Sequence, residues 1–177
     1  MRRALSPSPM PSSRIHLRPP RPDDADAFLA AVTASRRLHG RWVSPPKDGA
    51  AYLTYLERMR QPGQAAFLVL RRDDDALVGV VNLSHIVMGA LRSAYLGYYA
   101  FAPQAGQGLM TEGLGAVCRH AFRVLKLHRV EANIQPDNRA SLALAKRCGF
   151  RKEGFSPRYL KINGRWRDHE RWAQLAD

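Results

Sequence analysis

"APQAGQGLMTEGL", residues 102–114, is the most informative stretch of this sequence. Gly106 and Gly108 stand two apart, and a segment with helical spacing follows them, with Thr111 and Glu112 in its first turn. A turn without bulky side chains before a helix presents unpaired backbone N–H groups and the positive end of the helix dipole at one point. We therefore predict an anion-binding loop here, although two glycines also suit a simple strand-to-helix turn.

The apolar pattern on both sides of this loop predicts a mixture of strands and helices. Apolar residues recur at helical spacing after the loop, and alternating or β-branched runs bounded by turn residues lie before and after it. We expect strands at 15–18, 94–101 and 129–134, helices at 25–35, 50–59, 110–124 and 141–148, a hairpin around an Asp-rich turn at 73–75, and a final hairpin around Asn163-Gly164. The predicted fold class is therefore α+β, with a mixed, mostly antiparallel twisted sheet flanked by helices.

The length and composition favour one domain in a reducing compartment. A chain of 177 residues suits a single domain over 14–177, and the Pro/Ser-rich residues 1–13 predict a flexible tail. Only two cysteines occur, Cys118 and Cys148, so neither a disulfide framework nor a metal site with paired spacing is indicated. No apolar run is long enough for a signal peptide or a membrane span, and we expect a cytoplasmic protein.

The charge and the absent motifs narrow the class of ligand. The 28 Lys and Arg against 15 Asp and Glu give a formal net charge of +13, which favours polyanionic neighbours such as a ribosome, RNA or a phosphorylated cofactor. The same charge also describes a solvated, arginine-rich surface. The sequence has neither a P-loop GK[ST] nor an early GxGxxG followed by an acidic residue, which argues against kinases, GTPases and dehydrogenases.

Further residues extend the pattern of the glycine loop along the chain. They are Leu96-Gly97-Tyr98, Gly106-Gln107-Gly108-Leu109-Met110 with Glu112, Asn138 with Ser141, Gly149-Phe150, Glu153-Gly154, and "NGRWRDH" at 163–169. In these residues the chain resembles the GNAT acetyltransferases, and within them the RimJ/RimL-type ribosomal-protein alanine N-acetyltransferases. The resemblance spans most of residues 14–175. The glycine loop is common to the whole superfamily, whereas its combination with "RWRDH" at 165–169 and with the loop containing Trp42 points to the branch that acetylates proteins.

The resemblance implies a donor and a set of residues that bind it. The donor is acetyl-CoA, with its pyrophosphate on the amides from Gly106 to Thr111, its pantetheine arm beside Ala100 to Ala102, and no metal. Asn138 meets the same arm. The implied cofactor-binding residues are Ala100, Phe101, Ala102, Gly106, Gln107, Gly108, Leu109, Met110, Thr111, Asn138 and Ser141.

The chain departs from the family pattern at three positions. Ala105 stands where members usually have Gln or Arg, and Met110 stands where many have Gly or Ala, but the backbone donors of the loop survive both changes. Ala145 occupies the position of a tyrosine that protonates the departing thiolate in many members. By resemblance to the closer branch, Ser141 is then the candidate for a hydrogen bond to the thiolate, while its alternative role is a helix N-cap.

Acyl transfer to an amine needs a neutral amine and a stabilised thiolate, and positioning of the two substrates supplies much of the rate. The sequence offers no single obvious base, and the candidates are Glu112, Glu131, His85, Asp168 and His169. We name Glu112 as the catalytic candidate, although a carboxylate in the first turn of a helix also complements the helix dipole.

The sequence gives the least specific evidence about the residues that bind the acceptor. Trp42 and Tyr98 are large enough to wall a substrate groove, although tryptophans are also common in cores. The leading hypothesis is acetylation of a protein N-terminal amine, with a ribosomal protein as the acceptor that the resemblance implies. The alternatives are a small amine, whose polycationic forms this charge would repel, and a basic RNA- or ribosome-binding module without transfer activity.

Overall fold

The computed structural model of the chain describes residues 13–176 and contains a seven-stranded sheet in the order β1-β2-β3-β4-β5-β7-β6. The strands are β1 (Ile15–Arg18), β2 (Ala65–Arg71), β3 (Leu77–Val87), β4 (Ser93–Ala100), β5 (Arg129–Ile134), β6 (Arg151–Ile162) and β7 (Arg165–Leu175). The helices are α1 (Ala25–Ala34), α2 (Arg36–His39), α3 (Gly49–Met59), α4 (Leu109–Arg123) and α5 (Arg139–Arg147), with 3-10 turns η1 (Pro22–Asp24) and η2 (Ala102–Gln104). The predicted α+β class with a mostly antiparallel sheet is confirmed, while the tail expected at residues 1–13 lies, except for Ser13, outside the described residues.

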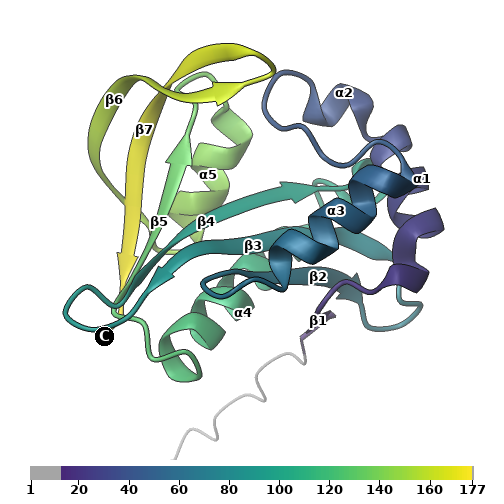
Figure 1. Cartoon of the computed structure of the whole chain (residues 1–177), viewed down its shortest axis with the longest axis horizontal. Helices are drawn as coiled ribbons and strands as arrows, with labels where there is room; N and C mark the ends of the chain where they lie inside the picture. Colours follow the sequence, from purple (N-terminus) through teal and green to yellow (C-terminus); the bar gives the residue numbers. More distant parts are fainter. Residues whose placement is uncertain (1–12, 177) are drawn as a thin grey trace, which may run out of the picture.

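Helices cover both faces of the sheet (Figure 1). Alternate residues of β2 point to opposite faces, so Leu68 packs with the aromatic side chains Phe28 and Tyr52 beneath α1 and α3. Val69 points the other way and packs with the apolar stripe of α4, which includes Leu114. Within residues 13–176, no helix has the length and apolar character that a membrane span requires.

The only parallel contact in the described sheet, between β4 and β5, creates the opening on which the site depends. The two strands pair only between Ser93–Tyr95 and Arg129–Glu131. Both strands continue beyond these residues, to Ala100 and Ile134, without further pairing to each other. The strands therefore separate toward their carboxyl ends, and the N-termini of α4 and α5 lie at that same edge (Figure 1).

Most predicted elements lie within about two residues of their observed bounds, and the exceptions are instructive. The loop containing Trp42 begins with the short helix α2, which the sequence pattern did not predict. Helix α5 begins at Arg139, because the side chain of Asn138 is its N-cap and accepts a hydrogen bond from the Ser141 N–H at 3.2 Å. The alternative N-cap role of Ser141 is therefore wrong, and its hydroxyl is available for other contacts.

The first turns of α4 pack very closely on the sheet because Gly113 has no side chain. A Cβ atom at Gly113 would lie 2.6 and 2.7 Å from the two Cγ atoms of Val69, which is closer than real Cβ contacts come. Gly115, two residues further along the same helix, has room for a methyl group, since its Cβ would meet Arg119 Nη1 at 3.5 Å, an ordinary van der Waals contact. The two glycines therefore have different roles, and only Gly113 sets the height of α4 above the sheet.

We expect Gly113→Ala to lower the free energy of unfolding by about 1–2 kcal/mol, because the stiff Val69 side chain cannot yield and overpacking outweighs the better helix propensity of alanine. Gly115→Ala is the matched control and should raise the free energy of unfolding by up to about 1 kcal/mol. Urea denaturation of both variants checks this, and equal stabilities would contradict the close packing of α4.

Candidate active site

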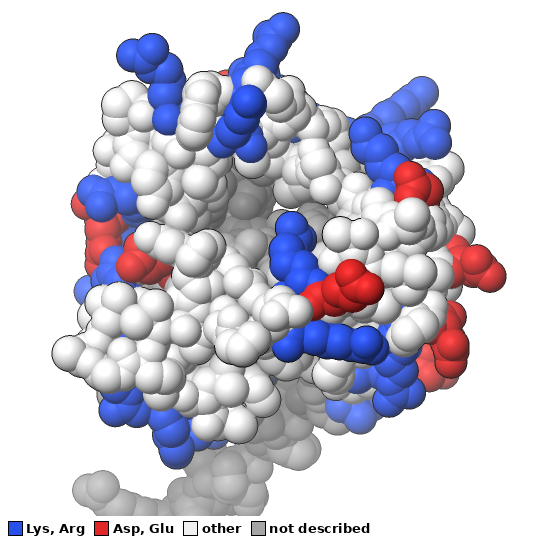
Figure 2. All heavy atoms as spheres, viewed as in Figure 1, with Lys and Arg blue, Asp and Glu red and all other residues white. Residues whose placement is uncertain are grey.

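A cavity of about 600 Å³ lies where β4 and β5 separate. Its walls come from α2 and the loop after it, the end of β4, the glycine loop with the start of α4, and α5. Figure 2 shows a hollow near the middle of this face of the molecule. The predicted site residues that line the cavity are Trp42, Tyr98, Ala100, Gly106, Gly108, Met110, Thr111, Asn138 and Ser141.

The glycine loop has the geometry of an anion site. Gly106 and Gly108 have φ angles of 79° and 78°, a backbone conformation that L side chains rarely adopt. None of the backbone N–H groups from Gly106 to Met110 donates to an acceptor within residues 13–176. The Thr111 N–H already donates to Gly108 O at 3.0 Å, so Thr111 offers only its hydroxyl. The free donors thus span Gly106–Met110, one residue fewer than the predicted range.

The predicted cofactor residues outside the cavity lining support the loop from below or beside it. Phe101 is fully buried and packs edge-to-face on Phe28, and Leu109 is buried in the core under α4. The Ala102 N–H donates to Ser35 Oγ at 2.8 Å, and the Gln107 side chain bonds the turn before the loop. These four residues fix the loop without contributing side chains to the cavity.

Glu112 is held away from the cavity by Arg14. Its Oε1 accepts from Arg14 Nε at 2.6 Å, and its Oε2 accepts from the Arg14 backbone N–H at 3.0 Å. The same guanidinium donates to Gln107 O at 3.2 Å, so the ion pair ties the start of β1 to the glycine loop. This geometry favours the structural role of Glu112 over the role of a base.

The other base candidates also lie outside the cavity lining, and most have structural partners. Glu131 pairs with Arg129, and Asp168 accepts from the Arg158 N–H at 2.7 Å. His169 is buried against the Arg167 carbonyl, and His85 is exposed with its ring against Tyr95. Among the described residues, no Asp or Glu lines the cavity.

Tyr98 and Ser141 connect the two sides of the opening. Ser141 Oγ donates to Tyr98 Oη at 2.8 Å, and Tyr98 Oη donates to the Ser141 carbonyl at 3.0 Å. Burial raises the pKa of Tyr98 to about 12, so the phenol stays protonated at neutral pH. The sequence predicted both residues, but it carried no signal for their contact across 43 residues.

His39 is a cavity residue that the sequence did not single out. Its Nε2 lies 2.9 Å from Ala100 O, its ring packs edge-to-face on Tyr99, and burial lowers its pKa. In the neutral form, Nε2–H therefore donates to the carbonyl at the end of β4. Its position three residues before Trp42 was the only available signal, because a lone histidine in a loop has no distinctive spacing.

The loop after α2 spans the opening. The Arg41 guanidinium stacks over the Trp42 ring at 4.6 Å and pairs with Asp137 at 3.1 Å. Further along the loop, Ser44 Oγ donates to Asn163 Oδ1 in the β6–β7 turn. The loop therefore joins elements from both sides of the separated strands and forms one wall of the cavity.

The comparison with known families agrees with this geometry. Residues 14–151 match the model of the acetyltransferase (GNAT) domain. The chain belongs to the GNAT acetyltransferase family. Relatives include the probable N-acetyltransferase YjcK of Bacillus subtilis, 40% identical over 68% of this chain and 67% of its own, and the [ribosomal protein uS5]-alanine N-acetyltransferase of Escherichia coli, 38% identical over 70% of this chain and 64% of its own. The aligned region thus spans about two thirds of each of these relatives.

Solved structures confirm the GNAT fold. RimJ of Mycobacterium smegmatis in complex with CoA-disulfide has a TM-score of 0.84 and 30% identity, covering 92% of this chain and 82% of its own. The spermidine N-acetyltransferase of Vibrio cholerae in complex with CoA and spermine has a TM-score of 0.78 at 22% identity, covering 93% and 96%, and shares the fold alone. The predicted family and fold are confirmed, and the N-acetyltransferase relatives support the predicted type of enzyme.

The buried His39 predicts a pH dependence of stability for this GNAT domain. Because the folded state lowers its pKa, the unfolded chain binds the proton first as the pH falls below about 6.5. The stability contributed by the neutral ring is therefore fully present above that pH and is lost as the pH falls below it, and His169, whose pKa burial also lowers, adds to the effect. His39→Gln keeps an N–H donor for Ala100 and should reduce this decrease. Denaturation at pH 7 and pH 5 checks it, and an unchanged decrease would refute the assignment.

Proposed function

We propose that this chain transfers the acetyl group of acetyl-CoA to the N-terminal α-amine of a protein, and that the acceptor is a ribosomal protein in the cytoplasm. The family and the relative named as a ribosomal-protein alanine N-acetyltransferase support the reaction and the acceptor class. The basic surface suits an acceptor bound near RNA. Figure 2 shows Lys and Arg side chains that project from the top of this face of the molecule. In the same view, Figure 1 shows the tip of the β6–β7 hairpin in that region.

The donor is proposed to enter through the opening between β4 and β5. The free amides of Gly106–Met110 and the positive end of the α4 dipole suit its pyrophosphate. From Leu96 onward, β4 pairs with β3 on one side, while no strand among the described residues pairs with its other edge. That edge offers backbone groups to the amides of a pantetheine arm, in the way that an extended peptide adds to a sheet.

The observation that carries the choice of acceptor is the absence of Asp and Glu from the described cavity lining. Without a carboxylate base in this lining, and with the His39 ring engaged to Ala100 O, an acceptor amine that is already neutral when it binds is favoured. An N-terminal α-amine has a pKa of about 7.7–8.0 and a lysine amine about 10.4, so the α-amine is neutral roughly 300 times more often near pH 7. The cavity therefore suits an N-terminal α-amine better than a lysine or a polyamine.

The proposed reaction needs only the two substrates and side chains that line the cavity. The neutral amine attacks the thioester carbonyl carbon, a C–N bond forms, the C–S bond breaks, and the amine proton neutralises the thiolate. Ser141 Oγ can rotate from Tyr98 Oη, 2.8 Å away, to donate to the leaving sulfur. Tyr98, which stays protonated, holds the Ser141 carbonyl and thereby the position of the serine.

An acceptor panel tests the proposed function. We expect thiol release from acetyl-CoA with an alanine-starting peptide to exceed release with the same peptide blocked at its N-terminus and carrying one lysine by at least about a hundredfold in kcat/KM. Spermidine should react as poorly as the blocked peptide, and kcat/KM should rise with pH according to the pKa of the acceptor amine. A preference for spermidine or lysine would refute the acceptor class, and no thiol release with any amine would refute the transferase.

Substitutions at Ser141 and Glu112, the two predicted catalytic residues, distinguish a catalytic role from a structural one. Ser141→Ala should lower kcat roughly ten- to hundredfold, because one donor to the developing thiolate is lost, while KM for acetyl-CoA changes little. Glu112→Gln should keep kcat within about threefold and lower the melting temperature, because it weakens the ion pair with Arg14. The reverse result, with Glu112→Gln inactive and Ser141→Ala active, would make Glu112 the base.

A further inference from the structure

The outer part of the β6–β7 hairpin, residues 156–169, extends beyond the rest of the sheet (Figure 1). β7 pairs with β5 only from Glu170 to Leu175, whereas its pairing with β6 continues to the turn at Asn163-Gly164. Both turn residues have positive φ angles, 48° and 76°, as a tight two-residue hairpin turn requires. The two strands of this segment, the outer hairpin, therefore stay paired up to the turn and hold their side chains on a fixed support.

The outer hairpin carries four basic side chains that form no ion pair within residues 13–176, namely Arg158, Lys161, Arg165 and Arg167. Arg167 Nε is buried and has no hydrogen-bond partner there, although buried donors are normally satisfied. Asp168, the one acidic residue of the segment, accepts from the Arg158 backbone N–H at 2.7 Å. The segment is therefore positively charged, and an anionic ligand would neutralise this charge.

A bulge determines the backbone conformation at Arg158. The register of β6 against β7 shifts between Ser156 and Leu160, and Arg158 has a φ of 46°. A positive φ is costly for a residue with a side chain, and the hydrogen bond to Asp168 helps to hold it. Bulges redirect side chains at sheet edges, and β6 is an edge strand of the described sheet. A strained backbone held in this way indicates a function for the exposed Arg158.

Trp166 adds an aromatic surface to these charges. It is 60% exposed, lies opposite Lys161 in the strand register and stands between Arg165 and Arg167 in the sequence. Unpaired bases stack on aromatic rings of this kind while neighbouring cations contact the phosphates. An acidic protein would use the charges but not the exposed ring. The combination therefore favours single-stranded RNA over an acidic protein.

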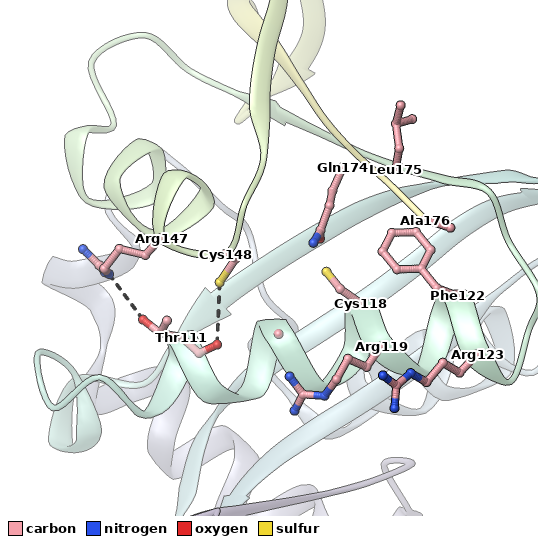
Figure 3. Close-up of a pocket in the computed structure, with 11 residues that line it drawn as sticks. Thr111, Cys118, Arg119, Phe122, Arg123, Arg147, Cys148, Gln174, Leu175 and Ala176 are labelled. Atoms are coloured by element: carbon pink, nitrogen blue, oxygen red, sulfur yellow. Dashed lines mark hydrogen bonds between the residues drawn. The ribbon is translucent and has the colours of Figure 1, made fainter. Parts of the chain in front are cut away.

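The cations of the outer hairpin are separate from those beside the glycine loop. Figure 3 shows a cavity of about 540 Å³ with Arg119, Arg123 and Arg147 in its lining. Thr111 and Arg147 also line the active-site cavity, so these arginines adjoin the proposed position of the donor. No residue of the outer hairpin lines either cavity. A ligand on the outer hairpin would therefore leave the place of the donor free.

We propose that the outer hairpin binds single-stranded RNA, with a base on Trp166 and phosphates on Lys161 and Arg165. The role of this RNA rests on the proposed function, in which the acceptor is a ribosomal protein. Ser44 Oγ donates to Asn163 Oδ1, so the turn of the hairpin lies beside the loop that forms one wall of the active site. RNA held there would raise the effective concentration of an N-terminus that is bound to the same RNA.

Fluorescence anisotropy of a labelled, unstructured RNA of about twelve nucleotides tests this site on the full chain, without acetyl-CoA or an amine. Lys161→Gln/Arg165→Gln should weaken binding and reduce the slope of log K against log salt by about 1.4, since each lost phosphate contact removes about 0.7. Trp166→Ala should weaken binding roughly five- to 150-fold with an unchanged slope, and Trp166→Phe should restore most of the affinity. These side chains are exposed, so the variants should fold, and circular dichroism checks this.

Arg60→Gln/Lys126→Gln is the matched control, because it removes two exposed cations that also form no ion pair within residues 13–176. It should keep the wild-type slope. A hairpin double variant with the slope of this control would overturn the proposal, and so would Trp166→Ala with wild-type affinity. Equal displacement of the RNA by a polyglutamate peptide of the same charge would also overturn it, because charge alone would then explain the binding.

The same chain separates this site from the proposed function. RNA binding with the predicted effects of the hairpin substitutions, but without thiol release from acetyl-CoA with any amine, would support the outer hairpin and refute the transferase. Acetylation of a free alanine-starting peptide by a chain whose RNA binding is insensitive to these substitutions would refute the RNA site alone.

Discussion

The separation of β4 and β5 after three paired residues is the constraint on which the rest of this structure depends. Parallel strands normally continue side by side, since each unpaired backbone group forfeits a ladder hydrogen bond. Here the carboxyl halves part, and the start of α4 and residues along α5 line the cavity at the opening. One change of pairing thus creates both the cavity and the position of the free loop amides beside it.

The opening is held by side-chain contacts that take the place of the missing ladder. Tyr98 and Ser141 connect β4 to α5, and Arg41 and Asp137 connect the loop after α2 to the turn before α5. His39 holds the last carbonyl of β4. The buried contacts of Tyr98 are the strong part of this arrangement, because the Arg41–Asp137 pair is exposed and such pairs contribute little. The opening therefore has a buried contact between β4 and α5, and a weaker, exposed contact between the loop after α2 and the turn before α5.

The sequence predicted the local features of this site and missed the contacts that assemble it. The strand, the glycine loop and the helix follow one another within a few residues, so spacing and turn chemistry were sufficient to predict them. The contacts of Tyr98, His39 and Glu112 join residues 43, 61 and 98 positions apart, and no local pattern encodes such pairings. Glu112 illustrates the consequence. A carboxylate in the first turn of a helix gives the same sequence pattern whether it faces a substrate or, as here, the guanidinium of Arg14 just before β1.

The positive charge of the chain and the lack of carboxylates in the described cavity lining both favour a neutral amine over a protonated one. A positive potential attracts a donor that carries several phosphates, and it repels polycationic acceptors. The same potential lowers the pKa of an amine that approaches the thioester, since protonation would add another like charge. Arg147 is the one Lys or Arg among the described lining residues of the active-site cavity. Under the proposed function, an electrostatic field that attracts the donor would also favour a neutral acceptor amine, which reduces the need for a dedicated base.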